Sequence, residues 1–319
     1  MSKNAEFFQS VGTNVTAPAH APYPTVSFEP QKITAGSKRW ASSQSTYWGA
    51  EQTHDQIPSG MYKCGQSPEY GPVLLSVPVE TDDIVPLPGN EGNEIVSEFS
   101  DFWSLEEQFR SRGFLHKRGF LLWGPPGSGK TSTIQLLVKQ IIERNGVVLL
   151  LDYPQVAAMC LLMMRSIEPK RPVMAIMEDL DALLQKHGEN EYLAVLDGEA
   201  QVDSIVFLAT TNYPERLDKR FVDRPSRFDT IRYIGMPCAE ARRVYLKAKE
   251  PSFTEDELDL WVRKSDGFSI AHLKELIIAV KCFGQDLSEV AERLEAMQDR
   301  KISSDEFPGR NVIGFGGKR

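Results

Sequence analysis

The 319-residue sequence has few cysteines and histidines and no long apolar run. Its four cysteines are scattered, without a Cys-x-x-Cys pair or the spacing of a zinc site. This pattern predicts free thiols in a reducing compartment rather than disulfides. No stretch approaches the roughly 18 apolar residues of a membrane span. The N-terminus also lacks the basic and apolar regions of a secretory signal. We therefore expect a cytoplasmic protein without a membrane segment.

Acidic residues outnumber basic ones by 44 to 36, which gives a net charge of −8. This balance does not favour a general nucleic-acid-binding surface. Apolar residues make up 41% and charged residues 25%, which is ordinary for a globular protein. The length is sufficient for two domains, or for one domain with extensions.

One stretch combines a predicted strand, a glycine-rich loop and a predicted helix. The apolar run 119–123 precedes Gly124–Thr131, and apolar residues then recur at helical spacing. Backbone N–H groups of such a loop close around phosphate, and the helix N-terminus adds partial positive charge. Lys130 can reach the β- and γ-phosphates, and the Thr131 hydroxyl can ligate Mg²⁺. A plain Gly/Pro turn is the disfavoured alternative. The predicted phosphate-binding residues are Gly124, Pro125, Pro126, Gly127, Ser128, Gly129, Lys130, Thr131 and Ser132.

Adjacent carboxylates follow a second apolar strand. Residues 173–177 lead directly into Glu178 and Asp179. An acidic residue at the end of a buried strand is where P-loop enzymes hold Mg²⁺, and a neighbouring carboxylate can polarise the attacking water. The alternative is that the two acids cap the following helix.

Two later segments supply further candidate groups. The apolar run 205–211 is followed by Asn212, which can reach the γ-phosphate or its water, although Asn after a strand is also ordinary turn chemistry. Arg224 and Arg227 follow, and a guanidinium can stabilise charge on a transferring phosphoryl group, including one bound by a neighbouring subunit. The alternative for these arginines is surface salt bridges with Asp218, Asp223 and Asp229.

The first 97 residues differ in composition from the rest. Residues 1–56 are rich in Ser, Thr, Ala, Gln and Pro, which predicts a mostly disordered arm that the fold does not need. Residues 57–97 form a small β-leaning segment. Its clearest strand, 73–79, is predicted to lie at a sheet edge because Pro78 cannot donate to a ladder.

Residues 98–236 contain five apolar strand candidates, the first four separated by helical segments. This alternation predicts a five-stranded parallel sheet covered on both faces. Apolar residues at helical spacing then predict a small helical bundle over 237–302. The Gly-rich stretch 303–319 is predicted to be an irregular tail.

Taken in order, these segments resemble the AAA family of P-loop ATPases over residues 98–300. Five segments resemble, in turn, its Walker A motif, Walker B motif, sensor 1 strand, arginine-finger segment and helical-lid segment: 124–131, 174–183, 209–212, 224–229 and 267–273. The resemblance implies an α/β P-loop NTPase fold with a C-terminal helical lid. It also implies Mg²⁺-dependent ATP hydrolysis in a ring, with a hexamer expected.

The sequence departs from the family pattern at two places. The family usually has Asp then Glu in Walker B, whereas this chain has Glu178 then Asp179. By this resemblance, we expect Glu178 and Thr131 to bind the metal ion and Asp179 to polarise the attacking water. A similar order occurs in the branch of the mitochondrial Rieske-protein translocase, whose membrane helix this chain lacks. Many unfoldases of the family carry an aromatic–apolar–Gly triplet in a pore loop after the second strand. The corresponding residues 151–155 lack this triplet, so Tyr153 either contacts a substrate or only packs within the domain.

The resemblance implies a ring-forming ATPase that remodels protein partners. The alternative is a nucleic-acid-associated motor or loader, which the negative charge disfavours. A third possibility, a nucleotide-gated scaffold without turnover, is opposed by the complete set of predicted catalytic residues. We expect ATP and Mg²⁺ as cofactors and no membrane partner. Catalytic roles are expected for Asp179, Glu178, Asn212, Arg224 and Arg227.

Overall fold

The computed structural model describes residues 39–43, 46–50, 54–68, 70–79, 85, 87–88, 91–197, 202–224 and 226–299. The predicted tail and most of the predicted arm lie outside these residues. Within them, no helix combines the length and the apolar character needed to cross a bilayer.

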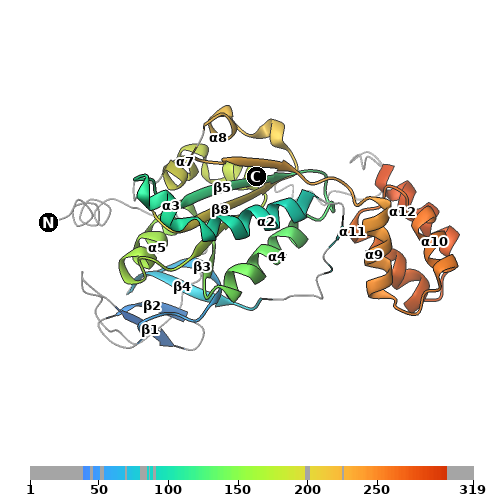
Figure 1. Ribbon diagram of the computed structural model, residues 1–319, viewed down its shortest axis with the longest axis horizontal. Coiled ribbons are helices and arrows are strands. Elements are labelled where there is room, and N and C mark those ends of the chain that lie inside the picture. The colour runs from blue at the N-terminus through green and yellow to red at the C-terminus, as the bar shows by residue number, and fades with distance from the viewer. Residues whose placement is uncertain are drawn as a thin grey trace, which may run out of the picture.

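A mixed β-sheet forms the centre of the fold (Figure 1). In the described residues it has nine strands in the order β1-β2-β4-β3-β6-β7-β8-β5-β9. The last five in this order pair in parallel, which confirms the predicted parallel sheet. These five strands are β5 (Lys117–Trp123), β6 (Val147–Leu150), β7 (Val173–Met177), β8 (Ile205–Thr211) and β9 (Thr230–Tyr233).

The sheet is larger than the five strands that the sequence predicts. β3 (Gly60–Ser67) pairs in parallel with β6, and β4 (Gly71–Val77) pairs antiparallel with β3. The prediction that this last strand lies at an edge is wrong, because β4 also pairs with β2. Pro78 follows the last residue of β4, so its missing N–H does not interrupt the ladder.

The prediction of a disordered arm is wrong for the part that the structure describes. β1 (Arg39–Ser43) and β2 (Thr46–Ala50) form an antiparallel pair within it. Trp40 is fully buried, and its indole N–H donates to Glu168 Oε1 at 2.5 Å. Composition alone missed this because one buried tryptophan supplies a large apolar area to a segment that is otherwise polar.

Helices cover both faces of the sheet (Figure 1). α2 (Glu91–Ser104) and α4 (Lys130–Glu143) pack on one face. α5 (Pro154–Ile167), α6 (Leu180–His187) and α7 (Glu189–Asp197) pack on the other. Shorter helical segments are α3 (Glu106–Ser111), η1 (Pro214–Arg216) and α8 (Lys219–Val222).

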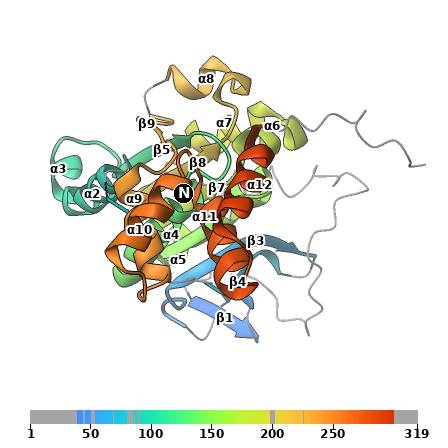
Figure 2. The ribbon, with the colours of Figure 1, turned by 90° about the vertical axis from the view of Figure 1, so that its right-hand side faces the viewer.

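The C-terminal helices form a separate bundle beside the sheet, which we call the lid (Figures 1 and 2). It consists of α9 (Ala239–Lys249), α10 (Glu255–Lys264), α11 (Ile270–Ile277), a π-helical turn (Ile278–Cys282) and α12 (Leu287–Asp299). The lid has its own apolar core, which includes Phe253, Trp261 and Leu273. Thr254 and Glu257 form a capping box that fixes the start of α10.

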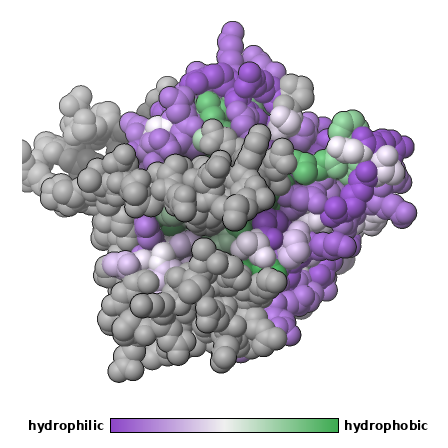
Figure 3. Space-filling model, turned by 90° about the vertical axis from the view of Figure 1, so that its left-hand side faces the viewer, coloured by the Kyte–Doolittle hydropathy of each residue, from purple (hydrophilic) through white to green (hydrophobic). Residues whose placement is uncertain are grey.

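The surface is mostly hydrophilic where it is described. Figure 3 shows small separate apolar patches on one face, between polar regions. The most exposed large apolar side chains are Phe283 on the lid and Phe114 in the loop before β5.

A buried ion pair connects the N-terminal segments to the rest of the sheet domain. Arg171 Nη1 lies 2.6 Å from Glu168 Oε2, and both side chains are at most 3% exposed. Arg171 also donates to the Ile57 carbonyl at 2.7 Å, and the Ile57 N–H donates to Glu168 at 3.1 Å. Because Trp40 contacts the same carboxylate, the pair holds two N-terminal segments at once.

We expect Glu168→Ala to lower the free energy of unfolding by about 3–5 kcal/mol, because it leaves Arg171 charged and buried without its partner. Trp40→Phe removes the indole N–H that Glu168 accepts, together with part of the buried ring, and should cost about 1–3 kcal/mol. Arg293→Ala is the matched control, because Arg293 forms an exposed ion pair with Glu275; its loss should be no more than about 1 kcal/mol. Urea unfolding measures all three. Unchanged unfolding of Trp40→Phe would show that the first strands are not docked as described.

Candidate nucleotide site

The glycine-rich loop joins β5 to α4 in the strand–loop–helix order that the sequence predicts. Gly129 precedes α4 with φ 107°, a left-handed conformation that favours glycine. A Cβ on Gly124 would lie 2.1 Å from the Ile234 carbonyl oxygen, so this position also requires glycine. The first N–H groups of α4 have no partner within the helix and point toward the loop. The loop therefore has the form of an anion cradle.

The Lys130 ammonium group lies at the centre of the site. It donates to the carbonyl oxygens of Gly124 and Pro125 at 2.8 and 2.9 Å, and to Asn212 Oδ1 at 2.7 Å. Burial lowers the pKa of Lys130, and the nearby Asp179 carboxylate opposes that shift. The side chain thus joins the loop to the end of β8.

Asn212 connects Lys130 to the acidic turn after β7. Its Nδ2 donates to Asp179 Oδ1 at 3.3 Å, while its Oδ1 accepts from Lys130. Strands β5, β8 and β7 are neighbours and run in parallel, so their carboxyl ends bring these three residues together. The structure therefore assembles the lysine, the amide and one carboxylate that the sequence selected separately.

The two acids differ in their surroundings. Asp179 occupies the N-cap position before α6 with φ 48°, but its side chain makes no capping hydrogen bond, so helix capping does not explain this carboxylate. Loss of solvation raises the pKa of Glu178, and the Asp179 and Asp152 carboxylates raise it further. Such a crowded carboxylate is suited to a cation. The Thr131 side chain is exposed at the start of α4. Thr131 and Glu178 are the residues that would hold Mg²⁺.

An orphaned hydroxyl supports a phosphate ligand in the loop. Ser128 is 1% exposed, and its Oγ has no hydrogen-bond partner among the described residues. A phosphate oxygen would supply the missing acceptor. The loop geometry, the Lys130 cation and this hydroxyl together fit a nucleoside triphosphate.

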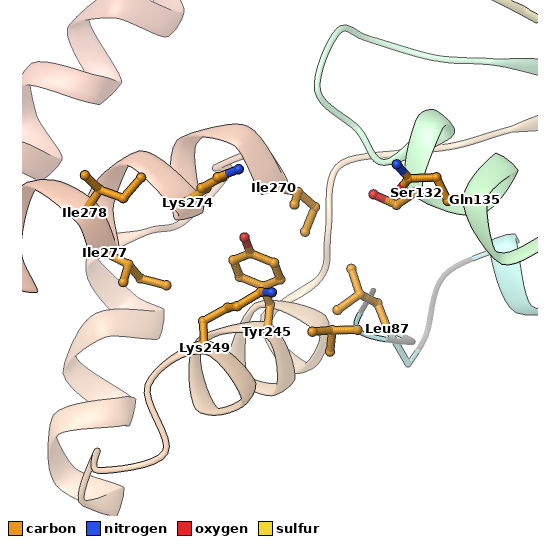
Figure 4. A pocket seen from close by; sticks show the side chains of 10 residues that line it. Leu87, Ser132, Gln135, Tyr245, Lys249, Ile270, Lys274, Ile277 and Ile278 are labelled. Atoms are coloured by element: carbon orange, nitrogen blue, oxygen red, sulfur yellow. The ribbon is translucent and has the colours of Figure 1, made fainter. Parts of the chain in front are cut away.

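The lid contacts the loop directly. The Ile270 N–H donates to the Gly127 carbonyl at 3.2 Å, and Ser269 Oγ caps α11 by accepting from the His272 N–H. A cavity of about 480 Å³ lies between the lid and α4 (Figure 4). Its lining residues are Val85, Leu87, Ser132, Gln135, Tyr245, Lys249, Ile270, Lys274, Ile277 and Ile278.

The two predicted arginines have different environments. Arg227 is 2% exposed and pairs with Asp197 through two contacts of 2.6 Å, Nε to Oδ1 and Nη2 to Oδ2. Arg224 has a 67% exposed side chain and lies 4.0 Å from the same carboxylate. Asp218 pairs instead with Arg220. The salt-bridge alternative for the arginines therefore holds for Arg227, but the partner is Asp197 and not one of the three aspartates that the sequence suggested.

Tyr153 is half-buried and packs against the core of the sheet domain. The Lys186 ammonium lies 5.0 Å from its ring centroid, and the His187 ring lies 5.1 Å from it. These contacts correspond to the packing alternative.

Sequence reasoning missed the residues whose roles depend on distant pairing. Asp197 ends α7 and gives no local signal beyond the Asp-Gly that follows the helix. Tyr245 and Lys249 occupy a helical pattern that also describes an ordinary amphipathic helix. Thr210 and Thr211 precede Asn212 and read simply as β-strand residues.

Comparison with known proteins identifies the family of the segment that contains the candidate site. Residues 120–236 match the model of the "ATPase family associated with various cellular activities (AAA)". The chain is 29% identical to the "Probable mitochondrial chaperone bcs1" of Schizosaccharomyces pombe over 225 residues, 66% of this chain and 49% of that protein. It is 26% identical to the "ATP-dependent zinc metalloprotease FtsH" of Marinobacter nauticus over 284 residues, 82% of this chain and 44% of that protein.

A human relative, "ATPase family gene 2 protein homolog A", is 28% identical over 193 residues, 54% of this chain and 22% of that protein. Each match spans less than half of the relative's own length. The matched family region begins within β5 and ends just after β9, and it therefore contains the loop, both acids, Asn212 and both arginines. The chain carries an ATPase domain of the AAA family, homologous to the AAA domains of the Bcs1 chaperone and of FtsH.

Proposed function

We propose that this protein hydrolyses ATP with Mg²⁺ and uses the cycle, within a homo-oligomeric ring, to remodel a protein partner. The contact among Lys130, Asn212 and Asp179 is the observation that carries the proposal. It supports the proposal because it brings an ammonium group, an amide and a carboxylate together at one edge of the sheet. The hexamer and the protein partner are parts of the proposal that the family resemblance motivates. The cytoplasmic location is the part that the scattered cysteines motivate.

The residues divide the hydrolytic step between them. The loop N–H groups, Ser128 and Lys130 bind the phosphates. Asp179 accepts a proton from a water molecule whose oxygen bonds to the γ-phosphorus, while the bond to the β–γ bridging oxygen breaks and leaves ADP and phosphate. Asn212 orients the water and the γ-phosphate. Mg²⁺, held through Thr131 and Glu178, would neutralise charge on the β- and γ-phosphates.

The cavity between α4 and the lid supplies the place for the base and ribose. It is lined by Ser132 and Gln135 of the helix that follows the loop, and by Tyr245 and Ile270 of the lid (Figure 4). Apolar and aromatic walls with a few polar groups suit a purine. Because Ile270 also bonds the Gly127 carbonyl, a change in the loop on phosphate release is transmitted to α11. Hydrolysis is thereby coupled to movement of the lid.

The different exposures of the two arginines favour Arg224 as the one that acts in a neighbouring subunit. The Arg227 side chain is buried and held by two contacts with Asp197, so it cannot leave its position without losing both. Arg224 is mostly exposed and only loosely associated with Asp197. In this proposal Arg227 fixes the segment, and Arg224 reaches the γ-phosphate of the neighbour.

A nucleic-acid motor is the second candidate function. It has in its favour only membership of a wide family, whereas the net charge of −8 opposes a general phosphate-backbone surface. The two candidates differ in what stimulates turnover, and an assay can separate them.

The proposed function is tested by ATP turnover of the whole chain. The unsubstituted protein should release phosphate only with Mg²⁺, and an unfolded protein should stimulate it more than DNA or RNA. Asp179→Asn should bind ATP and Mg²⁺ but lose roughly 10²–10⁴-fold in turnover, the usual contribution of a general base. Glu178→Gln should instead require a higher Mg²⁺ concentration. Turnover independent of Mg²⁺, or stimulated only by nucleic acid, would contradict the proposal.

We expect Arg224→Ala to bind ATP normally and to lose roughly 10³–10⁵-fold in turnover, the contribution of arginine fingers in other P-loop systems. Arg227→Ala should mainly lower the unfolding midpoint, because it leaves Asp197 without its bidentate partner. Mixing Arg224→Ala with Lys130→Ala should restore part of the activity, since one interface then pairs an intact loop with an intact arginine. Full turnover of Arg224→Ala, or no gain in verified mixed assemblies, would show that Arg224 does not act in trans.

A further inference from the structure

Two threonines at the end of β8 contact the turn that carries the catalytic carboxylates. The Asp179 N–H donates to Thr210 Oγ1 at 3.1 Å. Thr211 Oγ1 donates to Asp181 Oδ1 at 2.7 Å. Both threonines are buried, with exposures of 4% and 0%. The acidic turn is therefore held at two points by hydroxyl groups of the neighbouring strand.

The alternation of side chains along β8 explains how consecutive residues reach two different points. Successive side chains of a strand point to opposite faces, so Thr210 and Asn212 share one face and Thr211 lies on the other. Accordingly, Thr210 and Asn212 both contact Asp179, one at its N–H and the other at its carboxylate. Thr211 contacts Asp181 instead. The turn after β7 therefore contacts side chains on both faces of β8. These contacts lie just beyond the last paired residues of the two strands, Met177 and Ala209.

The backbone of Asp179 requires such support. Its φ of 48° lies in the left-handed region, which residues other than glycine rarely adopt. Such a conformation persists where the surrounding contacts hold it, and these positions cluster at functional sites. Thr210 supplies the acceptor for the N–H of this residue.

Thr211 supports the other side of the site as well. Its Oγ1 accepts from the Tyr213 N–H at 3.0 Å while it donates to Asp181. The hydroxyl therefore closes a loop of backbone around Asn212, whose amide contacts both Lys130 and Asp179. A change at Thr211 would reach Asn212 through Tyr213, and Asp179 through Asp181.

We propose that Thr210 and Thr211 are positioning residues for hydrolysis, which fix the Glu178–Asp181 turn and Asn212 in a single arrangement around the reacting phosphate. This inference rests on the proposed ATP hydrolysis. Neither threonine touches the phosphates in this role; each acts through a neighbour. Their loss should slow the chemical step and leave the binding of ATP, which depends on the loop and Lys130, nearly unchanged.

Paired substitutions separate the hydroxyl from the shape of the side chain. Thr210→Val and Thr211→Val keep the branched shape and remove the hydroxyl, whereas Thr210→Ser and Thr211→Ser keep the hydroxyl. Thr230→Val is the matched control, because Thr230 lies on β9, outside the site, and is also buried, with an exposure of 5%. Its hydroxyl likewise donates to a carboxylate, that of Glu98, at 2.7 Å. The measurements are kcat, the Kd of a fluorescent ATP analogue and the urea midpoint.

We expect the valine variants to lose at least about tenfold in kcat with Kd changed by less than about threefold, the signature of an interaction used only in the transition state. The serine variants should retain most of the turnover. Thr230→Val should lose stability without losing kcat. Unchanged kcat in the valine variants, equal loss in the serine variants, or equal loss in Thr230→Val would overturn the positioning role alone. Absence of turnover in the unsubstituted chain would overturn the proposed function and this inference together.

Discussion

A buried ammonium group needs oxygen partners on all sides, and this requirement determines how the nucleotide site is built. Lys130 meets it with two carbonyls of its own loop and the amide oxygen of Asn212. The third partner directly follows β8, more than 80 residues later in the chain, and it is available only because β8 lies beside β5 in parallel. The same amide then reaches Asp179 after β7. The parallel order of these strands is therefore what converts three separate sequence motifs into one site.

The N-terminal strands and the lid attach to opposite parts of this sheet domain. The strands continue the sheet from β6, and the buried pair of Glu168 and Arg171 fixes them in place. The lid contacts the phosphate loop itself, through Ile270 and Gly127. One attachment adds to the stability of the domain, and the other couples it to the nucleotide in the proposed cycle. Movement that follows hydrolysis is accordingly expected at the lid.

The parts of the fold that depend on local patterns could be predicted from the sequence. The loop at Gly124–Thr131, the apolar strands and the lid helices each have a spacing that specifies them. The N-terminal strands could not be predicted, because their order depends on pairing between distant segments, and Trp40 is the main apolar anchor in a polar stretch. The different environments of Arg224 and Arg227 could not be predicted either, since both depend on Asp197, about 30 residues away in the sequence. The edge position predicted from Pro78 was wrong for a simpler reason, because Pro78 lies one residue beyond the end of β4 and takes no part in the ladder.

The affinity of ATP for Lys130→Ala, measured without turnover by titration with a fluorescent analogue, tests the central claim most directly. Lys139→Ala is the matched control, because this lysine is exposed on the same helix. Loss of a charge-assisted contact of about 1.5–3 kcal/mol predicts that Lys130→Ala binds roughly 10–100-fold more weakly. The control should bind as the unsubstituted chain does. Equal affinity of both variants would contradict the assignment of the phosphate site to this loop.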